Sequence, residues 1–211
     1  GYVNMLDRWG KDDPAVREEA IAAIKNESEH MKVLIDQLLF LARGEMDRHV
    51  LDMKPLNSCS IMEEIYDESI MLEAELPEEK RHEFDASELY ADDNLKTFMI
   101  SADEAMIKQA VRILRDNAMK YTPAGGQIHV QVEAWEMYLK IDIADTGIGI
   151  PEQHQGTIFK RFYREDAVHD VEGIGIGLYL AREIISLQGG YIRVASEVGK
   201  GSVFSVFLLR K

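Results

Sequence analysis

The sequence predicts an α+β fold in which helices cover one face of a mixed, mostly antiparallel sheet, with a helical hairpin in front of that domain. Two observations support this prediction. Apolar residues recur at helical spacing through most of residues 1–44. The remainder alternates helical segments with short runs of alternating apolar and polar residues that end in turn sequences. Helices interleaved with strand hairpins pack against one side of a sheet.

Residues 12–44 are expected to form one long helix. Asp13 is a suitable N-cap, Pro14 suits the first turn, and Gly44 is a suitable stop. Its apolar positions recur at alternating steps of three and four, which is a heptad seam with one polar member. The seam consists of Ile21, Ile24, Ser28, Met31, Ile35, Leu38 and Ala42. The preceding segment also forms one helical face, made of Tyr2, Met5, Leu6 and Trp9.

Such a hairpin cannot bury both of its sides by itself. We therefore expect residues 1–48 to dimerise into a four-helix bundle; the alternative is that they pack on the chain's own globular domain. Residues 45–58 lose the heptad and indicate a linker leading into a strand. Residues 49–211 are expected to form the globular domain.

The globular domain is expected to contain three helices and six strands in addition to the one after the linker. The helices are expected at 61–76, 102–121 and 176–188. Four of the strands are expected at 81–87, 97–103, 126–135 and 137–145. The fifth and sixth are expected to form a closing hairpin over 190–209, with its turn at 197–201.

Composition excludes several classes of function. The formal net charge is −14, which argues against nucleic-acid binding and against anionic membrane surfaces, because both need clustered Lys and Arg. Cys59 is the single cysteine, so neither an internal disulfide nor a cysteine metal site is expected. No run of about 18 apolar residues occurs, so no membrane span is expected.

The stretch "DTGIGIP" (145–151) follows a strand that is expected to be buried. Asp145 at the strand end can accept a hydrogen bond from an exocyclic amine such as that of adenine. Gly147 and Gly149 let the backbone approach a flat ring closely. The alternative interpretation is an ordinary turn at the end of a strand.

The stretch "RDNAMKYTPAGG" (115–126) begins at a helix end. Asn117 and Lys120 share a helical face. An amide oxygen can bind Mg²⁺, an ammonium group can meet phosphate oxygens, and Tyr121 can lie against a base. The alternative is a polar helix end with a solvated lysine.

Two further stretches indicate an anion site and a lid. In "GIGIGL" (173–178), Gly173, Gly175 and Gly177 lead into a helix, whose N-terminus attracts anions; a flexible loop is the alternative. In 158–172, an aromatic cluster precedes a polar loop, as in a mobile lid. Arg161 and Arg164 are placed to reach phosphates there, and solvated arginines are the alternative.

Together these motifs resemble the nucleotide-binding boxes of the sensor histidine kinases. That family has the Bergerat fold, which it shares with type II gyrases, heat-shock chaperones of the ninety-kilodalton class and mismatch-repair ATPases. "DNAMKYTP" looks like the N box, "DTGIGIP" the first glycine box, "IFKRFYR" the F box and "GIGIGL" the second glycine box. "GKGSVFSVFL" is similar to the closing glycine segment, and "ESEHMKVLIDQLLFLAR" to the second helix of the dimerisation and phosphotransfer domain.

The resemblance implies an ATP site and its residues. Asp145 would bind the adenine amine with Gly149 close to the ring, Asn117 would bind Mg²⁺, and Lys120 and Arg164 would contact phosphates. Tyr121 would pack near adenine, and the glycines of 173–177 would hinge the lid. The rest of the expected nucleotide site is Gly147, Ile150, Arg161, Tyr163, Leu178 and Ser202. The resemblance also implies a homodimer, phosphoryl transfer to a histidine, and relay to a response-regulator aspartate.

The match has departures. No histidine is followed by an acidic residue and then Pro, so residues 1–48 are expected to lack the phosphoacceptor and the chain to be a piece of a kinase. Ile113 stands where the N box usually has a second Asn, and the 165–172 lid carries no Lys or Arg. The leading interpretation is therefore the cytoplasmic catalytic core of a bacterial membrane sensor kinase. A degenerate nucleotide-binding or dimerisation module is the alternative. A hydrolysing relative is disfavoured because Ile113 cannot act as a base.

Overall fold

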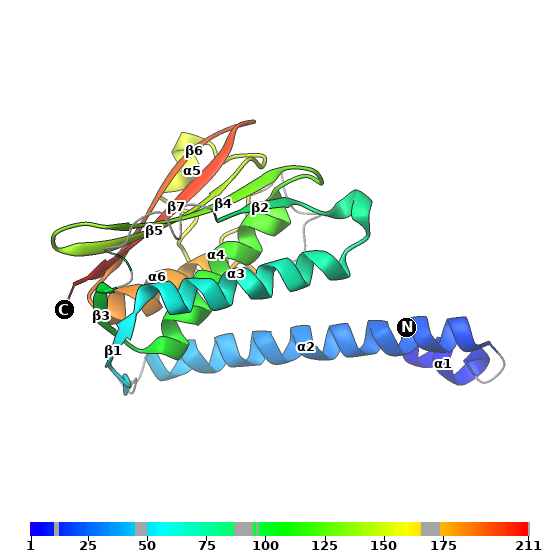
Figure 1. Ribbon diagram of the computed structural model, residues 1–211. Helices are drawn as coiled ribbons and strands as arrows, with labels where there is room; N and C mark the ends of the chain where they lie inside the picture. Colours follow the sequence, from blue (N-terminus) through cyan, green and yellow to red (C-terminus); the bar gives the residue numbers. More distant parts are fainter. Residues whose placement is uncertain (11–12, 45–49, 87–94, 96, 166–173, 211) are drawn as a thin grey trace. The chain divides into compact units, whose positions relative to one another are not determined.

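The computed structural model divides the chain into two compact units, Gly1–Val50 and Leu51–Lys211 (Figure 1). It describes residues 1–10, 13–44, 50–86, 95, 97–165 and 174–210. The division lies two residues beyond the boundary expected from the sequence between 48 and 49. Within the described part of the chain, no helix is both long and apolar enough to cross a membrane.

The first unit is a helical hairpin made of α1 (Tyr2–Trp9) and α2 (Pro14–Gly44), which pack against each other. Asp13 caps α2 as expected, since its Oδ1 accepts a hydrogen bond from the Ala15 N–H at 2.9 Å. The expected heptad seam is largely on the surface: Ile21, Met31 and Ile35 are each more than half exposed. The hairpin therefore presents an apolar stripe that it does not cover itself.

The second unit is built on a five-stranded sheet with the order β2-β4-β5-β7-β6. Only β2 and β4 pair in parallel; the other neighbours are antiparallel, so the sheet is mixed and mostly antiparallel as predicted. The strands are β2 (Glu83–Asp85), β4 (Gln127–Ala134), β5 (Tyr138–Asp145), β6 (Tyr191–Glu197) and β7 (Gly201–Leu209). A separate two-stranded sheet joins β1 (Lys54–Asn57) to β3 (Met99–Ala102).

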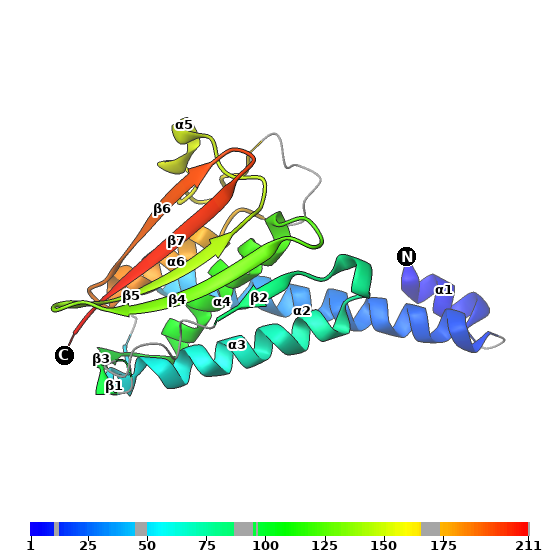
Figure 2. The same ribbon diagram turned by 45° about the horizontal axis from the view of Figure 1, so that its top comes forward.

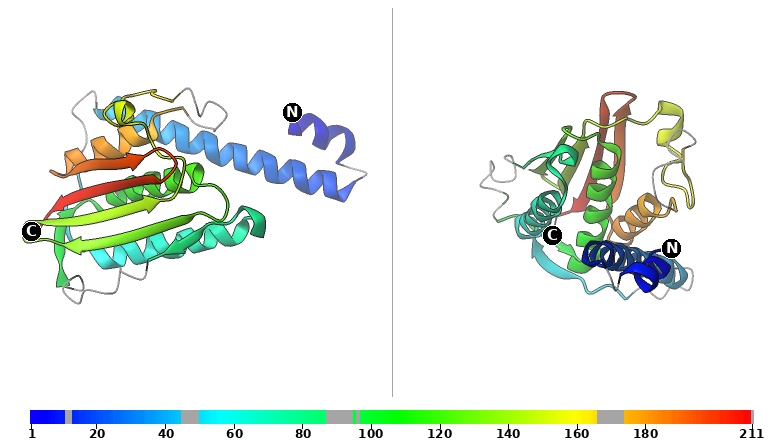
Figure 3. Two further views of the ribbon diagram at one scale, coloured as in Figure 1. Left: turned by 90° about the horizontal axis from the view of Figure 1, so that it is seen from above. Right: turned by 90° about the vertical axis from the view of Figure 1, so that its right-hand side faces the viewer.

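Three long helices cover one face of the sheet, as Figures 2 and 3 show. They are α3 (Ser58–Glu75), α4 (Glu104–Tyr121) and α6 (Gly177–Leu187), and α4 packs against both of the others and against β5. The short helices η1 (Glu78–Lys80) and α5 (Glu152–Gln155) lie in connections. The core between helices and sheet includes Ile65, Ile107, Leu114, Leu180, Ile184, Ile128, Ile141, Ile143, Phe204 and Val206, all nearly inaccessible to solvent.

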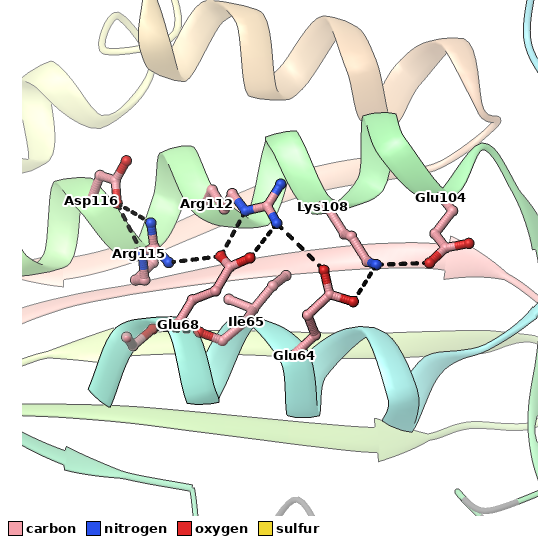
Figure 4. Close-up of polar contacts among 9 residues, drawn as sticks. Glu64, Ile65, Glu68, Glu104, Lys108, Arg112, Arg115 and Asp116 are labelled. Atoms are coloured by element: carbon pink, nitrogen blue, oxygen red, sulfur yellow. Dashed lines mark hydrogen bonds and ion pairs between the residues drawn. The ribbon is translucent and has the colours of Figure 1, made fainter. Parts of the chain in front are cut away.

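The contact between α3 and α4 is reinforced by a chain of alternating charges (Figure 4). It begins with Glu104 and Lys108, whose charged groups lie 2.7 Å apart, and ends with Arg115 and Asp116, also 2.7 Å apart. Glu64, Arg112 and Glu68 connect the two ends in that order. This chain runs along the side of α4 that faces α3, up to the residue just before Asn117.

The predicted elements are present, with shifted ends. Helix α3 begins at Ser58 rather than at residue 61, because the Asn57 side chain caps it by accepting a hydrogen bond from the Cys59 N–H at 2.9 Å. The β4–β5 hairpin closes through a bond from the Trp135 N–H to the Tyr138 carbonyl at 2.8 Å. The β6–β7 hairpin turns at 197–201, where Lys200 N–H donates to the Glu197 carbonyl at 3.0 Å.

Candidate functional site

Asp145 is the last residue of β5 and lies opposite Ser202 of β7. Its Oδ1 accepts two backbone hydrogen bonds, from the Gly147 N–H at 2.9 Å and from the Ser202 N–H at 3.3 Å. Among the described residues, its Oδ2 has no hydrogen-bonding partner. The carboxylate is therefore held in one orientation by the backbone while one oxygen can still accept a bond.

Partial burial raises the pKa of the Asp145 carboxyl above its ordinary value, and the N–H groups of Gly147 and Ser202 lower that pKa in part. Because Oδ2 has no partner among the described residues and is not a buried atom, it can accept a hydrogen bond from a ligand or from water.

The turn after Asp145 is held against the end of α4. The Ile148 N–H donates to the Tyr121 carbonyl at 3.2 Å. Gly147 lies so close to that carbonyl that a Cβ there would be 2.4 Å from the oxygen. Gly149 has a φ of +71°, and a Cβ there would be 2.1 Å from the Glu197 carbonyl oxygen. Both glycines are thus required by contacts within the protein, whether or not a flat ring lies nearby.

A second set of bonds fixes the turn from the side of the β6–β7 hairpin. The Ile150 N–H donates to Ser196 Oγ at 2.7 Å, and Gln155 Nε2 donates to the carbonyls of Ile150 and Ser196 at 3.0 and 2.7 Å. Ser202 Oγ lies 3.0 Å from Ser196 Oγ. Sequence reasoning identified Ile150 and Ser202 but missed Ser196 and Gln155, because isolated polar residues carry no motif signal.

Asn117 lies on α4, one turn before the helix end. Its Nδ2 donates to the Ile113 carbonyl at 2.9 Å, so the amide is fixed and its oxygen points away from that bond. Lys120 is exposed, with Nζ 5.2 Å from the centre of the Tyr121 ring. Asp116, which precedes Asn117, is instead bound by Arg115.

Tyr121 connects the end of α4 to the segment after α5. Burial raises the pKa of its hydroxyl; the charge of Arg164 lowers that pKa in part, and Glu165 raises it further. Arg164 is therefore electrostatically coupled to Tyr121. Tyr163 makes an edge contact with the His154 ring, with ring centres 6.2 Å apart.

Gly175 and Gly177 lie close to Tyr163 and Ile113, respectively. A Cβ on Gly175 would be 2.5 Å from the Tyr163 carbonyl oxygen, and one on Gly177 would be 3.3 Å from Ile113 Cγ2. Leu178 follows in the first turn of α6 and is partly buried. Gly173 and residues 166–172 of the expected lid lie outside the described residues.

Arg161 contacts helix α6 through Tyr179. Its Nη2 donates to the Tyr179 hydroxyl at 2.9 Å, and its guanidinium lies 4.7 Å from the centre of the Tyr179 ring. Sequence reasoning missed Tyr179 as a partner. The four stretches that looked separate in sequence thus adjoin one another: Asp145 reaches Tyr121 through Gly147, Tyr121 is coupled to Arg164, and Ile113 meets Gly177.

Residues 102–211 match the family model described as histidine kinase-, DNA gyrase B-, and HSP90-like ATPase. The chain is 32% identical over 214 residues to the signal transduction histidine-protein kinase ArlS of Staphylococcus haemolyticus. It is 34% identical over 208 residues to ArlS of Staphylococcus aureus. Each alignment covers 98% of this chain and 44% of the relative, so the chain spans less than half the length of these relatives.

Solved structures show the same fold. The full-length ShkA structure in complex with AMPPNP superposes with a TM-score of 0.74 at 22% identity, over 93% of this chain and 39% of that one. The Acinetobacter baumannii histidine kinase AdeS gives a TM-score of 0.66 at 19% identity, over 99% of this chain and 91% of that one. The mycobacterial sensor histidine kinase MprB gives a TM-score of 0.59 at 23% identity, over 75% of this chain and 98% of that one.

Proposed function

Because the chain belongs to the family of histidine kinase-, DNA gyrase B-, and HSP90-like ATPases, we propose that it is the ATP-binding catalytic part of a sensor histidine kinase. In this proposal the γ-phosphoryl group of ATP passes to a histidine and then to an aspartate of a response regulator. The relatives that the chain matches over 98% of its length are named signal transduction histidine-protein kinases, which supports this branch of the family.

The orientation of Asp145 is the observation that carries the proposal. Its Oδ1 is occupied by two backbone N–H groups, and its Oδ2 is left to accept a bond from a ligand amine. The exocyclic amine of adenine is such a donor. The residues around Asp145 then act as a fixed frame: Gly147 and Ile148 keep the turn against Tyr121, and Ser202 holds the carboxylate from β7.

The α4 end of the site suits the phosphates and a divalent cation. The Asn117 amide is held by a backbone carbonyl through its nitrogen, which leaves the oxygen as the ligand atom that Mg²⁺ prefers. Mg²⁺ bound there would neutralise phosphate charge during transfer. Lys120 and Arg164, which both lie near Tyr121, would supply cationic groups for phosphate oxygens. The remaining expected nucleotide contacts are Gly149, Ile150, Arg161, Tyr163, Gly173, Gly175, Gly177 and Leu178.

The exposed apolar stripe of the hairpin supports a role in dimerisation, because a second copy of the stripe would cover Ile21, Met31 and Ile35.

No histidine of the printed sequence has the acidic residue and proline that follow an acceptor, so we propose that these 211 residues do not phosphorylate themselves. We also propose that they act on the cytoplasmic side of a membrane sensor kinase. A degenerate binding module is not favoured, because the relatives that match 98% of the chain are named signal transduction histidine-protein kinases.

Calorimetric titration of ATP tests the proposal, with and without Mg²⁺ and beside Asp145→Asn. Asparagine can keep the two bonds that Oδ1 accepts, but it places an N–H₂ where the adenine amine would donate. We expect micromolar, Mg²⁺-sensitive binding to the native chain and none to the variant. Absence of binding to the native chain at millimolar ATP would refute the proposal, and equal binding to both proteins would refute the role of Asp145.

A further inference from the structure

A buried histidine outside the nucleotide motifs is joined to the residue next to Tyr121. His82 lies between η1 and β2, with 7% of its side chain exposed. Its Nδ1 is 2.7 Å from Glu73 Oε1 at the end of α3, and its backbone N–H donates to Glu73 Oε2 at 2.8 Å. Its Nε2 is 3.0 Å from the carbonyl oxygen of Thr122, the C-cap of α4.

Both ring nitrogens of His82 therefore face acceptors. The Thr122 carbonyl has no hydrogen to give, so Nε2 must donate to it. A proton must also lie between Nδ1 and the Glu73 carboxyl, since two lone pairs at 2.7 Å would repel each other. The Glu73 side chain is 7% exposed and has both oxygens engaged by His82, so the pair is satisfied as a unit. Arg81 is directed elsewhere, to the carbonyls of Ala74 and Leu76.

The bond to Thr122 is one of three that join the segment 81–83 to the segment 122–126. The Gly125 N–H donates to the Arg81 carbonyl at 2.8 Å, and the Glu83 N–H donates to the Gly126 carbonyl at 2.9 Å. The His82 bond is the one closest in sequence to Tyr121, whose carbonyl accepts the Ile148 N–H. On the far side, Gln127 N–H donates to Thr146 Oγ1 at 2.9 Å, and Thr146 N–H donates to the Gln127 carbonyl at 3.0 Å.

We propose that His82 is a positioning residue for nucleotide binding, which holds the Thr122 carbonyl and thereby the Tyr121 backbone against the turn that follows Asp145. The path runs from Glu73 on α3 through His82 and Thr122 to Tyr121, and then through Ile148 to the Asp145 turn. His82 has no contact with the expected ligand atoms. Its effect is confined to the adenine side of the site, because Asn117 is held separately by Ile113. The inference rests on the proposed ATP site.

The variants must separate positioning from folding. His82→Leu alone would leave Glu73 Oε1 without its imidazole partner, with only the backbone N–H of residue 82 still donating to Oε2, and a buried carboxylate in that state is itself destabilising. The double variant Glu73→Leu/His82→Leu leaves no buried charge, but it frees two backbone groups, the N–H of residue 82 that donated to Glu73 and the carbonyl of Thr122, so its folding is checked by urea unfolding before ATP is titrated. His129→Leu is the matched control, because His129 lies on β4 beside Asp85 and is 32% exposed.

Two measurements on the whole chain test the inference: calorimetric titration with ATP and with ADP, and hydrogen exchange of the Ile148 amide by NMR. In the double variant we expect Kd to rise about tenfold for ATP and for ADP alike, because the loss of one hydrogen bond corresponds to about that change in affinity. We also expect the Ile148 amide to exchange faster by about the same factor, while the Ile141 amide in the middle of β5 and the control variant stay unchanged.

The inference is overturned if the folded double variant binds ATP within twofold of His129→Leu. It is also overturned if ATP affinity falls while exchange at Ile148 is unchanged, since the effect would then not pass through Tyr121. Failure of the native chain to bind ATP would instead refute the proposed function. The exchange rate of Ile148 would still decide whether His82 holds the turn.

Discussion

Replacing Gly149 by alanine should damage the turn after Asp145 far more than the same change at a neighbouring glycine. Gly149 and Gly199 both have a positive φ, +71° and +78°, and their turns are joined by a bond from the Gly199 N–H to the Ile148 carbonyl at 2.8 Å. A Cβ at Gly199 meets nothing within 4 Å, whereas one at Gly149 would be 2.1 Å from the Glu197 carbonyl oxygen. The two substitutions therefore share the backbone strain and differ in the clash.

The magnitude follows from these contacts. A side chain in the left-handed region costs about 1 kcal/mol, and this is the whole cost expected for Gly199→Ala. At Gly149, ordinary contact begins at 3.4 Å, so the Glu197 backbone must move by about 1.3 Å, the difference between 3.4 Å and 2.1 Å. Such overpacking adds roughly 2 kcal/mol. We expect Gly149→Ala to lower the free energy of unfolding by about 3 kcal/mol.

Urea unfolding followed by circular dichroism measures the difference, with both variants compared with the native chain. The transition of the second unit should move about three times as far for Gly149→Ala as for Gly199→Ala, and ATP affinity should fall only in the former. A difference below about 0.5 kcal/mol between the variants, which is the usual range for a neutral surface change, would refute the steric argument.

Three further outcomes are expected. ATP affinity, measured by calorimetric titration, should fall as pH is lowered through the raised pKa of Asp145, because protonation removes the acceptor. A carboxyl group with a raised pKa in the folded state lowers stability as pH rises. Asp145→Asn should therefore not lower the melting temperature at neutral pH, as measured by calorimetric melting. Glu68→Gln should lower the free energy of unfolding by about 1 kcal/mol at neutral pH, as its carboxylate is about one-third exposed. Hydrogen bonding from Arg112 lowers the pKa of Glu68, so this difference should be full above the ordinary Glu pKa and shrink as pH falls through the lowered one in urea titrations. Ile35→Glu should shift the chain from dimer to monomer in sedimentation velocity, with an unchanged mass distribution refuting the role of the stripe.

The helices and the antiparallel hairpins could be predicted because their signals are local. Asp13 is read directly as a cap, and the 190–209 hairpin carries its own turn sequence. The parallel pairing of β2 with β4 could not be predicted, because Glu83 pairs with Gln127 across an intervening helix. The same limit applies to the charge chain, where Lys108 meets Glu64 from 44 positions away.

In the candidate site, too, local features could be predicted from the sequence and contacts between distant residues could not. Its motifs were found from local sequence, but the partners that hold them were not. Gly149 was expected to make room for a ring, whereas the structure gives it a second reason, the close approach of the Glu197 carbonyl. His82 carried no signal in the sequence, because its role depends on Glu73 and Thr122, which come from two different helices.

The departure at Ile113 has a narrower effect than the sequence implied. Asn117 is oriented by the backbone carbonyl of residue 113, which any residue supplies, so the isoleucine does not disturb the amide that we propose binds Mg²⁺. Its side chain instead lies close to Gly177 at the start of α6, where it contributes apolar packing. Relative to the family pattern, Ile113 thus lacks one polar group on the side of the site proposed for the phosphates, and the bond that orients Asn117 is kept. Two backbone N–H groups hold Asp145 and a third bonds the Tyr121 carbonyl, so the frame is built mainly from backbone groups. We therefore expect the proposed nucleotide binding to depend more on the glycines and on the segments that brace them than on the residue at position 113.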